Sequence, residues 1–169
     1  ASLFDVSYFS TIDPAGNNKT ATLKTGNIAL NSSTLDVQLN GGSSYDQLNV
    51  SGTVALYSAE LHVSLGFTPR VGQQFMLIKN DGTDAVEGTF NGYADGDLVQ
   101  SGALAFRISY IGGTGNDVVL TRYSGTAVKD GVLYYFGTDD TDSFDIKLLE
   151  NAGVLEVTTK SGRNAGSTV

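Results

Sequence analysis

The amino-acid sequence predicts an all-β protein whose N-terminal part is a solenoid of stacked strands. Three observations lead to this prediction. Apolar and polar residues alternate along short segments, turn-forming residues separate those segments, and one segment recurs farther along the chain. The composition agrees with them: the 169 residues include 21 Gly, 2 Pro and no Trp or Cys, and only 17% are charged. Such a mixture is typical of many short strands joined by tight turns.

Alternation with a period of two is the dominant pattern, and it places apolar side chains on one face of a strand. Clusters of Gly, Asn, Asp and Ser lie between these segments and indicate turns. Residues 59–65, AELHVSL, have some helix propensity, but their alternation favours a strand. The alternating segments are Leu35-Val37-Leu39, Leu61-Val63-Leu65, Phe106-Ile108-Tyr110, Phe144-Ile146-Leu148 and Leu155-Val157.

The internal repeat is the most informative feature. Residues 25–40 align without gaps on residues 51–66, with an offset of 26 and seven identities in sixteen positions. A period of 20–50 residues made of strands and turns is the signature of a solenoid, in which neighbouring turns share one core. We therefore expect the two copies to stack in parallel register. The identities are Gly26/Gly52, Ala29/Ala55, Leu30/Leu56, Ser32/Ser58, Leu35/Leu61, Val37/Val63 and Leu39/Leu65.

The rest of the chain is less repetitive. Residues 130–138 resemble residues 152–160 at an offset of 22, and the final residues 160–169 look like a further unit cut short. The apolar residues 1–10 are predicted to pair with a preceding rung or with another copy. From these patterns we predict three parts: β-helix rungs over 1–66, a closing β-strand block over 67–123, and a truncated Gly/Asp-rich β-repeat over 124–169. In the closing block we expect strands within 71–80, 86–93, 103–113 and 116–123.

Residues 45–121 resemble the C-terminal part of bacterial autotransporter-associated β-strand repeat proteins. The motifs that carry the resemblance are YDQL (45–48), NDGTDAV (80–86), GTF (88–90) and ISYxGGxGNDVVLT (108–121). One departure is NGYADGD at 91–97, which we expect to alter one turn only. The resemblance implies a right-handed parallel β-helix that ends in closing strands. It also implies a secreted or surface-attached bacterial protein, and it brings no catalytic residues.

Charge and hydropathy exclude several classes of partner. The net charge of −8 and the pI of about 4.4 make binding to a polyanion such as DNA unfavourable. No apolar run approaches the ~18 residues of a membrane-spanning helix, so we expect no membrane insertion. The sequence begins at Ala1, without a signal peptide, and reads as a piece of a longer precursor.

Two acidic loops are candidate calcium sites, and no other cofactor is expected. Asp139, Asp140 and Asp142 form the densest acidic cluster, and hard carboxylate oxygens this close in sequence suit Ca²⁺. The alternative is a solvated turn between strands. Asp117 is a weaker candidate, because residues 112–120 fit one calcium-binding nonapeptide while the stacked copies that such sites need are missing. The alternative there is a tight turn into the following strand.

The residues give no reason to expect catalysis. His62, the only His, matches Asp36 in the repeat and should point outward. It has no neighbouring Ser or Cys nucleophile in the sequence. The outward set Asp36, Gln38, His62 and Ser64 is too sparse for the paired carboxylates of a polysaccharide-cleaving enzyme. The tyrosines are scattered, so core and strand-pairing roles are favoured over a sugar-stacking platform.

These observations predict a non-enzymatic structural segment of a large secreted or cell-surface bacterial protein: a stalk, an adhesin shaft or a filament unit. The alternative is an extracellular module that binds carbohydrate or calcium. The expected partners are neighbouring segments of the same chain or identical chains, which pair through β-edges. A surface carbohydrate is a further possible partner.

Overall fold

The computed structural model describes the chain except residues 1–2, 8, 17–18, 150–153 and 162–169. Within the described residues all regular structure is β-strand, as predicted. No helix of this part of the chain is long and apolar enough to cross a membrane. The chain divides into two compact units, Ala1–Tyr123 and Ser124–Val169. The prediction for the last residues, 162–169, lies outside the described part.

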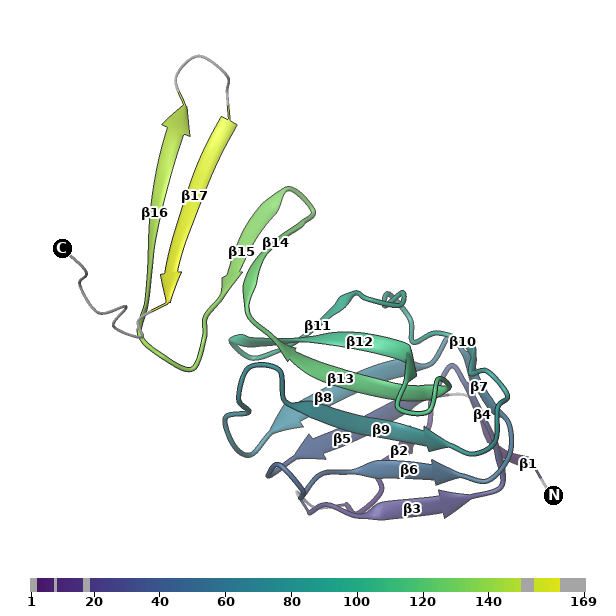
Figure 1. Cartoon of the computed structure of the whole chain (residues 1–169). Coiled ribbons are helices and arrows are strands. Elements are labelled where there is room, and N and C mark those ends of the chain that lie inside the picture. The colour runs from purple at the N-terminus through teal and green to yellow at the C-terminus, as the bar shows by residue number, and fades with distance from the viewer. Residues whose placement is uncertain (1–2, 8, 17–18, 150–153, 162–169) are drawn as a thin grey trace. The chain divides into compact units, whose positions relative to one another are not determined.

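Three sheets build the first unit (Figure 1). The four-stranded sheet and the three-stranded sheet contain only parallel pairs. The six-stranded sheet is parallel across β3, β6 and β9 and antiparallel from β9 through β13 and β12 to β11. In sheet order the strands are β1 (Leu3–Ser7), β4 (Asn27–Asn31), β7 (Val54–Tyr57) and β10 (Glu87–Gly88); β2 (Thr11–Ile12), β5 (Thr34–Leu39) and β8 (Glu60–Leu65); and β3 (Thr22–Thr25), β6 (Gln47–Val50), β9 (Gln74–Asn80), β13 (Asp117–Tyr123), β12 (Leu104–Gly112) and β11 (Leu98–Ser101).

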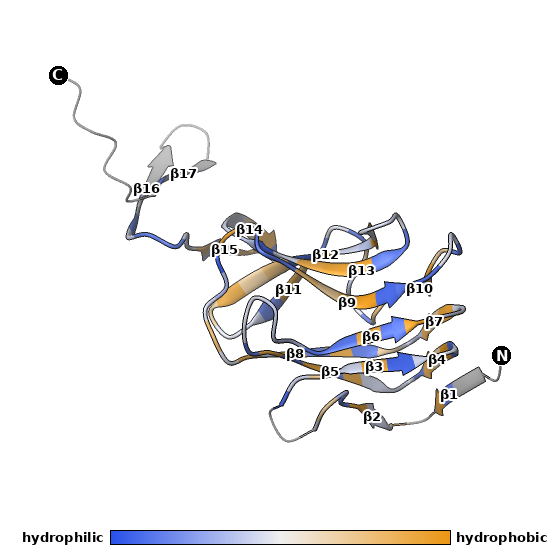
Figure 2. Ribbon diagram, turned by 60° about the horizontal axis from the view of Figure 1, so that its bottom comes forward, coloured by the Kyte–Doolittle hydropathy of each residue, from blue (hydrophilic) through white to orange (hydrophobic). Residues whose placement is uncertain are grey.

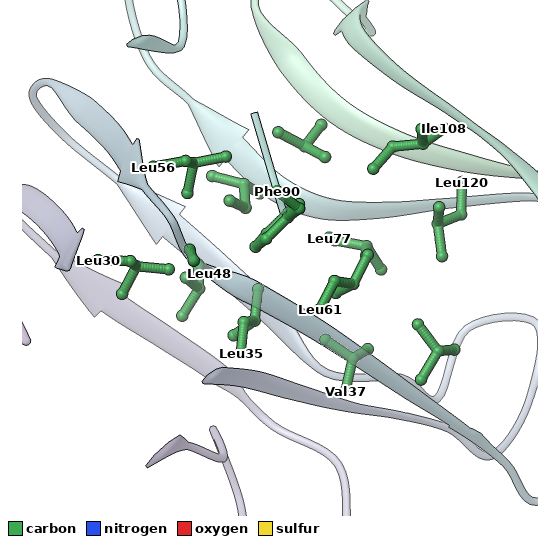
Figure 3. Close-up of a cluster of buried hydrophobic side chains, with 14 of the residues drawn as sticks. Leu30, Leu35, Val37, Leu48, Leu56, Leu61, Leu77, Phe90, Ile108 and Leu120 are labelled. Carbon is green, nitrogen blue, oxygen red and sulfur yellow. The ribbon is translucent and has the colours of Figure 1, made fainter. Parts of the chain in front are cut away.

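The 26-residue repeat is stacked in parallel register, as predicted. Leu30 lies beside Leu56 in the β4–β7 pair, and Leu35 lies beside Leu61 in the β5–β8 pair. Val37 and Val63 pair two residues further along. All six side chains are buried, and Figure 3 shows five of them, all but Val63, labelled in the shared core. Because the register is constant, each inward-facing side chain packs on its counterpart in the next pass of the chain.

One kind of corner joins the four-stranded sheet to the three-stranded sheet three times. Phe9, Ser32 and Ser58 precede β2, β5 and β8, and all three adopt left-handed backbone conformations with φ of 60°, 48° and 55°. The Phe9 amide donates to the Ser32 carbonyl and the Ser32 amide donates to the Tyr57 carbonyl, both at 2.9 Å. The left-handed region is unfavourable for side chains other than Gly, so this bond ladder holds the chain in the turn at each corner.

A first pass of the chain, from β1 to β3, stacks on the repeat and was not recognised in the sequence as a third copy. The described part of the apolar N-terminal segment, β1, pairs with β4 of the next pass. Offsets between the first and second passes differ among the strands: Leu3 pairs with Asn27, Thr11 with Thr34, and Thr22 with Gln47. The varying offset explains why a gapless alignment does not find this copy.

The antiparallel strands close the far end of the stack. Phe90, Phe106 and Ile108 are fully buried, and Phe106 packs edge-on against Phe75 of β9, with ring centroids 6.1 Å apart. The Tyr110 hydroxyl donates to the Tyr93 carbonyl and accepts from the Phe90 amide, both at 2.9 Å. Burial raises the pKa of this phenol to about 12. The block is therefore fixed by an apolar core and by one buried hydroxyl.

The four strands expected in the closing block are present, but they differ from the prediction in extent. The segment 86–93 contributes only two strand residues, and the strand ends at Gly88, whose φ is 80°. Strand β11 was not expected from the sequence. Val99 is its one fully buried residue, and two of its four residues, Gln100 and Ser101, are polar. In Figure 2, β9 and β13 each show a hydrophobic stretch, and β9 ends in hydrophilic residues.

The described residues of the second unit form two antiparallel pairs of strands. In the first, β14 (Gly125–Lys129) pairs with β15 (Val132–Phe136) around Asp130 and Gly131, whose φ values of 52° and 76° are those of a type I′ turn. In the second, β16 (Asp142–Leu149) pairs with β17 (Val154–Ser161). The two similar segments, 130–138 and 152–160, therefore supply the second strands of successive hairpins.

Candidate functional sites

The Asp117 carboxylate lies in a buried turn and is surrounded by hydrogen-bond donors. One oxygen accepts from the Asn80 amide at 2.8 Å. The other accepts from the Thr114 amide at 2.9 Å and from the Thr114 hydroxyl at 3.2 Å. A carboxylate that already accepts three bonds has little capacity left for a cation. The geometry matches the tight turn that the sequence left open as the alternative.

Two asparagines extend this turn into the neighbouring loop. The Asn116 side chain donates to the carbonyls of Asp81 and Asp84, both at 3.1 Å. The Asn80 side chain donates to the Asp84 carbonyl at 2.9 Å. Both asparagines are buried, so the loop after β9 and the turn before β13 form one hydrogen-bonded corner. The sequence did not reveal this network, because its members are more than 30 residues apart.

The acidic cluster Asp139, Asp140 and Asp142 does not act as one group, because Asp142 is held by separate hydrogen bonds. Asp142 begins β16, and its carboxylate accepts from the Thr138 amide at 2.6 Å and from the Thr138 hydroxyl at 2.7 Å. The hydroxyl bond is the main reason that the pKa of this carboxyl is lowered. Asp139 and Asp140 are exposed. In the described residues, no group of three or more His, Asp or Glu side chains is arranged to hold a metal ion.

Asp46 is the buried carboxylate that the sequence analysis did not identify as a site. It is fully buried just before β6 and accepts from the Ala21 amide at 2.7 Å and from the Gln38 amide at 2.9 Å. Burial raises its pKa, against the lowering effect of the two amides, and the charges of Asp13 and Asp36 raise it further. Its partners lie 25 and 8 residues away, which leaves no local sequence signal.

Gln38 connects Asp46 to the loop after β2. Hydrogen bonding orients the carboxamide so that its nitrogen donates to Asp46, to the Lys19 carbonyl at 2.9 Å and to Asp13 at 3.2 Å. The Asp13 carboxylate also accepts from the amides of Ala15 and Gly16. Gln38 was expected among the outward positions, but it is buried. The neutral Gln38 carboxamide thus bridges the Asp13 and Asp46 carboxylates. These hydrogen bonds connect β5, the loop after β2 and the residue before β6.

His62 and Asp36 form a pair on the outer face of the three-stranded sheet. They are register partners in the β5–β8 pair, and the His62 Nδ1 lies 2.9 Å from an Asp36 carboxylate oxygen. The His62 side chain is 67% exposed, so it points outward as predicted. The nearby Ser64 hydroxyl donates to the Val37 carbonyl at 3.4 Å. The pair links two rungs of the sheet.

Tyrosines within the described part of the first unit differ in their surroundings. Tyr110 is buried, and Tyr45 packs edge-on against Phe75 with ring centroids 5.3 Å apart. Tyr123 lies beneath the Arg107 guanidinium, 5.1 Å from its ring centroid. Tyr57 is exposed. Tyr45 and Tyr110 have the packing roles that the sequence favoured, whereas Tyr57 does not.

One open surface hollow lies along the loop between β8 and β9. A single segment lines it, and its side chains are mixed in character. The Gln73 carboxamide is used within the loop, where its oxygen accepts from the Arg70 amide at 3.0 Å. Because no second element faces this hollow, it lacks the converging groups that fix a small ligand. The lining residues are Phe67, Thr68, Arg70, Val71, Gly72 and Gln73.

Comparison with known proteins gives no match: no family model, no curated protein and no solved structure is similar to this chain. The likeness to autotransporter-associated repeats therefore remains a prediction from the sequence motifs.

Proposed function

We propose that this chain is a non-enzymatic structural segment of a large secreted or cell-surface bacterial protein, such as a stalk, an adhesin shaft or a filament unit. We further propose that its parallel sheets are the faces of a right-handed β-helix. The observation that carries the proposal is the constant register of the two full passes, in which Leu30, Leu35 and Val37 each lie beside their own repeat counterparts. Parallel strands in one sheet are connected almost always in the right-handed sense.

The buried polar groups of the first unit support a structural role. Asp46 and Asp117 are the buried carboxylates of this unit, and backbone amides hold both. A carboxylate that serves as a general acid or base needs access to substrate. Here each one joins segments that are distant in sequence. The polar residues that could have formed a site are used to fix loops.

Calcium binding is the weaker alternative. Neither candidate loop offers free, converging carboxylates: Asp117 accepts three hydrogen bonds, and Asp142 turns back onto Thr138. Carbohydrate binding has no specific observation in its favour, since the open hollow is lined by one loop.

Thermal unfolding with calcium and with chelator tests this choice. A calcium ion at a hundred times its dissociation constant would stabilise the folded state by about 2.7 kcal/mol. The structural proposal predicts the same melting temperature in both buffers. It also predicts that hydrogen exchange of β4 to β9 is governed by global unfolding, with or without a panel of acidic and neutral glycans. A large calcium shift that Asp142→Ala abolishes, or glycan-dependent protection of one surface, would favour a binding module instead.

A further inference from the structure

The three sheets of the first unit share one open end. Strands β1, β2 and β3 belong to the same pass of the chain, and each is the last strand of its sheet. The outer edge of such a strand presents backbone amides and carbonyls that can pair with another strand. Neither β1 nor β3 contains Pro, the residue that most directly blocks edge pairing. This end of the stack is suited to receive further strands.

The opposite end is closed. The outer edge of β8 is already used, because the Ala59 carbonyl accepts from the Asn91 amide at 2.7 Å and the Val63 carbonyl accepts from the Ser101 hydroxyl at 2.7 Å. The four-stranded sheet ends there in a strand of two residues, β10. Head-to-tail stacking of copies through these two sheets would therefore find few backbone groups to pair with. Two copies can instead meet open end against open end, an arrangement that a two-fold axis closes into a dimer.

Phe9 marks the open end as a contact surface. Its side chain is 93% exposed, although the residue occupies the left-handed corner position that Ser32 and Ser58 occupy in later passes. At this exposure the large apolar side chain makes little packing contact with the part of the chain that the structure describes. In a dimer through the open end, a second copy would cover it.

The charges at the open end fit a reciprocal arrangement. Asp5 on β1 and Lys24 on β3 are both exposed, and their strands have five and four residues. A two-fold axis through the short strand β2 reverses the chain direction and brings β1 of one copy against β3 of the other. Each Asp5 would then face a Lys24 of the second copy. Opposite charges that face each other across antiparallel strands stabilise the pair.

We infer that the chain forms a two-fold dimer through its open end, in which β1 pairs antiparallel with β3 of a second copy and Asp5 faces Lys24 across the interface. The inference rests on the proposed function in one respect, namely that the three parallel sheets are the faces of one β-helix. The partner that we propose for the open end is a second copy of this chain. The net charge of −8 opposes dimerisation at low salt, and this repulsion is screened beyond about 8 Å at 0.15 M salt.

Sedimentation equilibrium of the full chain over a range of concentrations tests the inference. We expect a monomer–dimer equilibrium that does not continue to larger species. Phe9→Ser should weaken it. Asp5→Lys and Lys24→Asp should each raise the dimer dissociation constant about tenfold, because the two-fold axis makes each contact count twice. The double variant Asp5→Lys/Lys24→Asp should restore it.

Matched controls come from later strands of the same sheets, away from the open end. Glu87 lies in β10 and Lys79 lies in β9, in register with Asn49, which is itself in register with Lys24. Glu87→Lys and Lys79→Asp should leave the dimer unchanged. A monomer at all concentrations, growth beyond two copies, or a double variant that stays monomeric would overturn the inference. None of these outcomes bears on the structural proposal, which the calcium and exchange experiments test separately.

Discussion

Two internal repeats lead to different structures in the two units of this chain. The sixteen-residue repeat at 25–40 and 51–66 forms parallel pairs that lie directly side by side. The nine-residue repeat at 130–138 and 152–160 contributes to two separate hairpins, each paired with its own preceding strand. The first unit buries a core between its sheets, whereas the first hairpin leaves Val128, Val132 and Leu133 exposed.

The length of the repeated segment explains the difference. The longer repeat contains two strands and the left-handed corner between them, so one copy carries the chain around an edge and the next copy can stack on it. The shorter repeat contains one strand and the turn before it, which suffices for a hairpin only. Similarity at a fixed offset therefore predicts stacking when the repeated segment includes the corner as well as the strand.

The largest expected effect of a single substitution is a core truncation in the stack. Leu35 is fully buried and packs beside Leu61, so Leu35→Ala should destabilise the first unit by roughly 2–5 kcal/mol. Leu133, which is 38% exposed in the first hairpin, is the matched control. Leu133→Ala should leave the main unfolding transition in place. Equal shifts of the urea midpoint for both variants would remove the distinction between the two units.

Removal of the Asp46 charge should cost somewhat less. Asp46→Asn leaves one buried amide facing donors, an effect of about 1–3 kcal/mol. The folded state raises the pKa of Asp46, so it favours the protonated form. The wild-type chain should gain stability from this group as the pH falls through the folded pKa toward the unfolded value. Asn does not titrate, so the deficit of the variant should grow from pH 7 to pH 4.

Urea unfolding of both chains at several pH values measures this deficit. Asp142→Asn is the control of opposite sign, since the folded state lowers the pKa of Asp142. The stabilisation from Asp142 should be lost as the pH falls through its folded pKa. A deficit for Asp46→Asn that shrinks toward acid pH would contradict the role assigned to its burial.

A smaller effect separates two glycines with the same backbone conformation. Gly88 and Gly131 have φ of 80° and 76°. At Gly131 an added Cβ meets no atom within 4 Å, whereas at Gly88 it would lie 2.5 Å from the Leu56 carbonyl oxygen. Gly131→Ala should therefore cost the hairpin only the left-handed strain of about 1–2 kcal/mol.

Gly88→Ala should cost the first unit more than that strain, because the β7–β10 pair must also separate. Amide exchange of β10 and of β15 reads the two sites independently. Faster exchange in the hairpin than in β10 after these substitutions would show that the β7–β10 contact is not tight.

Sequence reasoning found the parts of the fold that repeat or alternate. It placed Leu35 beside Leu61 because both segments share apolar positions and small corner residues. It missed the first pass, whose offsets to the second pass vary between strands, and it missed β11, where Val99 is the only strongly apolar inward residue. For the polar groups as well, contacts between residues far apart in the sequence were the ones that sequence reasoning missed.

The candidate sites were predicted less well than the fold. Asp117 was identified by a nonapeptide pattern and Asp142 by the acidic cluster around it, but local donors three and four residues away hold their carboxylates. Asp46 was not identified, because its amide partners, Ala21 and Gln38, lie 25 and 8 residues away in the sequence. Carboxylates that are close in sequence therefore predicted where loops lie. They did not predict that Asp46 is buried, which depends on contacts between distant segments.

An engineered disulfide tests the stacked register most directly. The chain contains no Cys, and Asp36 and His62 are register partners whose side chains already lie 2.9 Å apart on the outer face. Adjacent strands are about 4.8 Å apart, within the range of Cα separations that a disulfide spans. The variant Asp36→Cys/His62→Cys should oxidise fully within one chain. The shifted pair Asp36→Cys/Ser64→Cys should not, because Ser64 is the partner of Gln38. Oxidation of the shifted pair, or of neither pair, would contradict the parallel register on which this account depends.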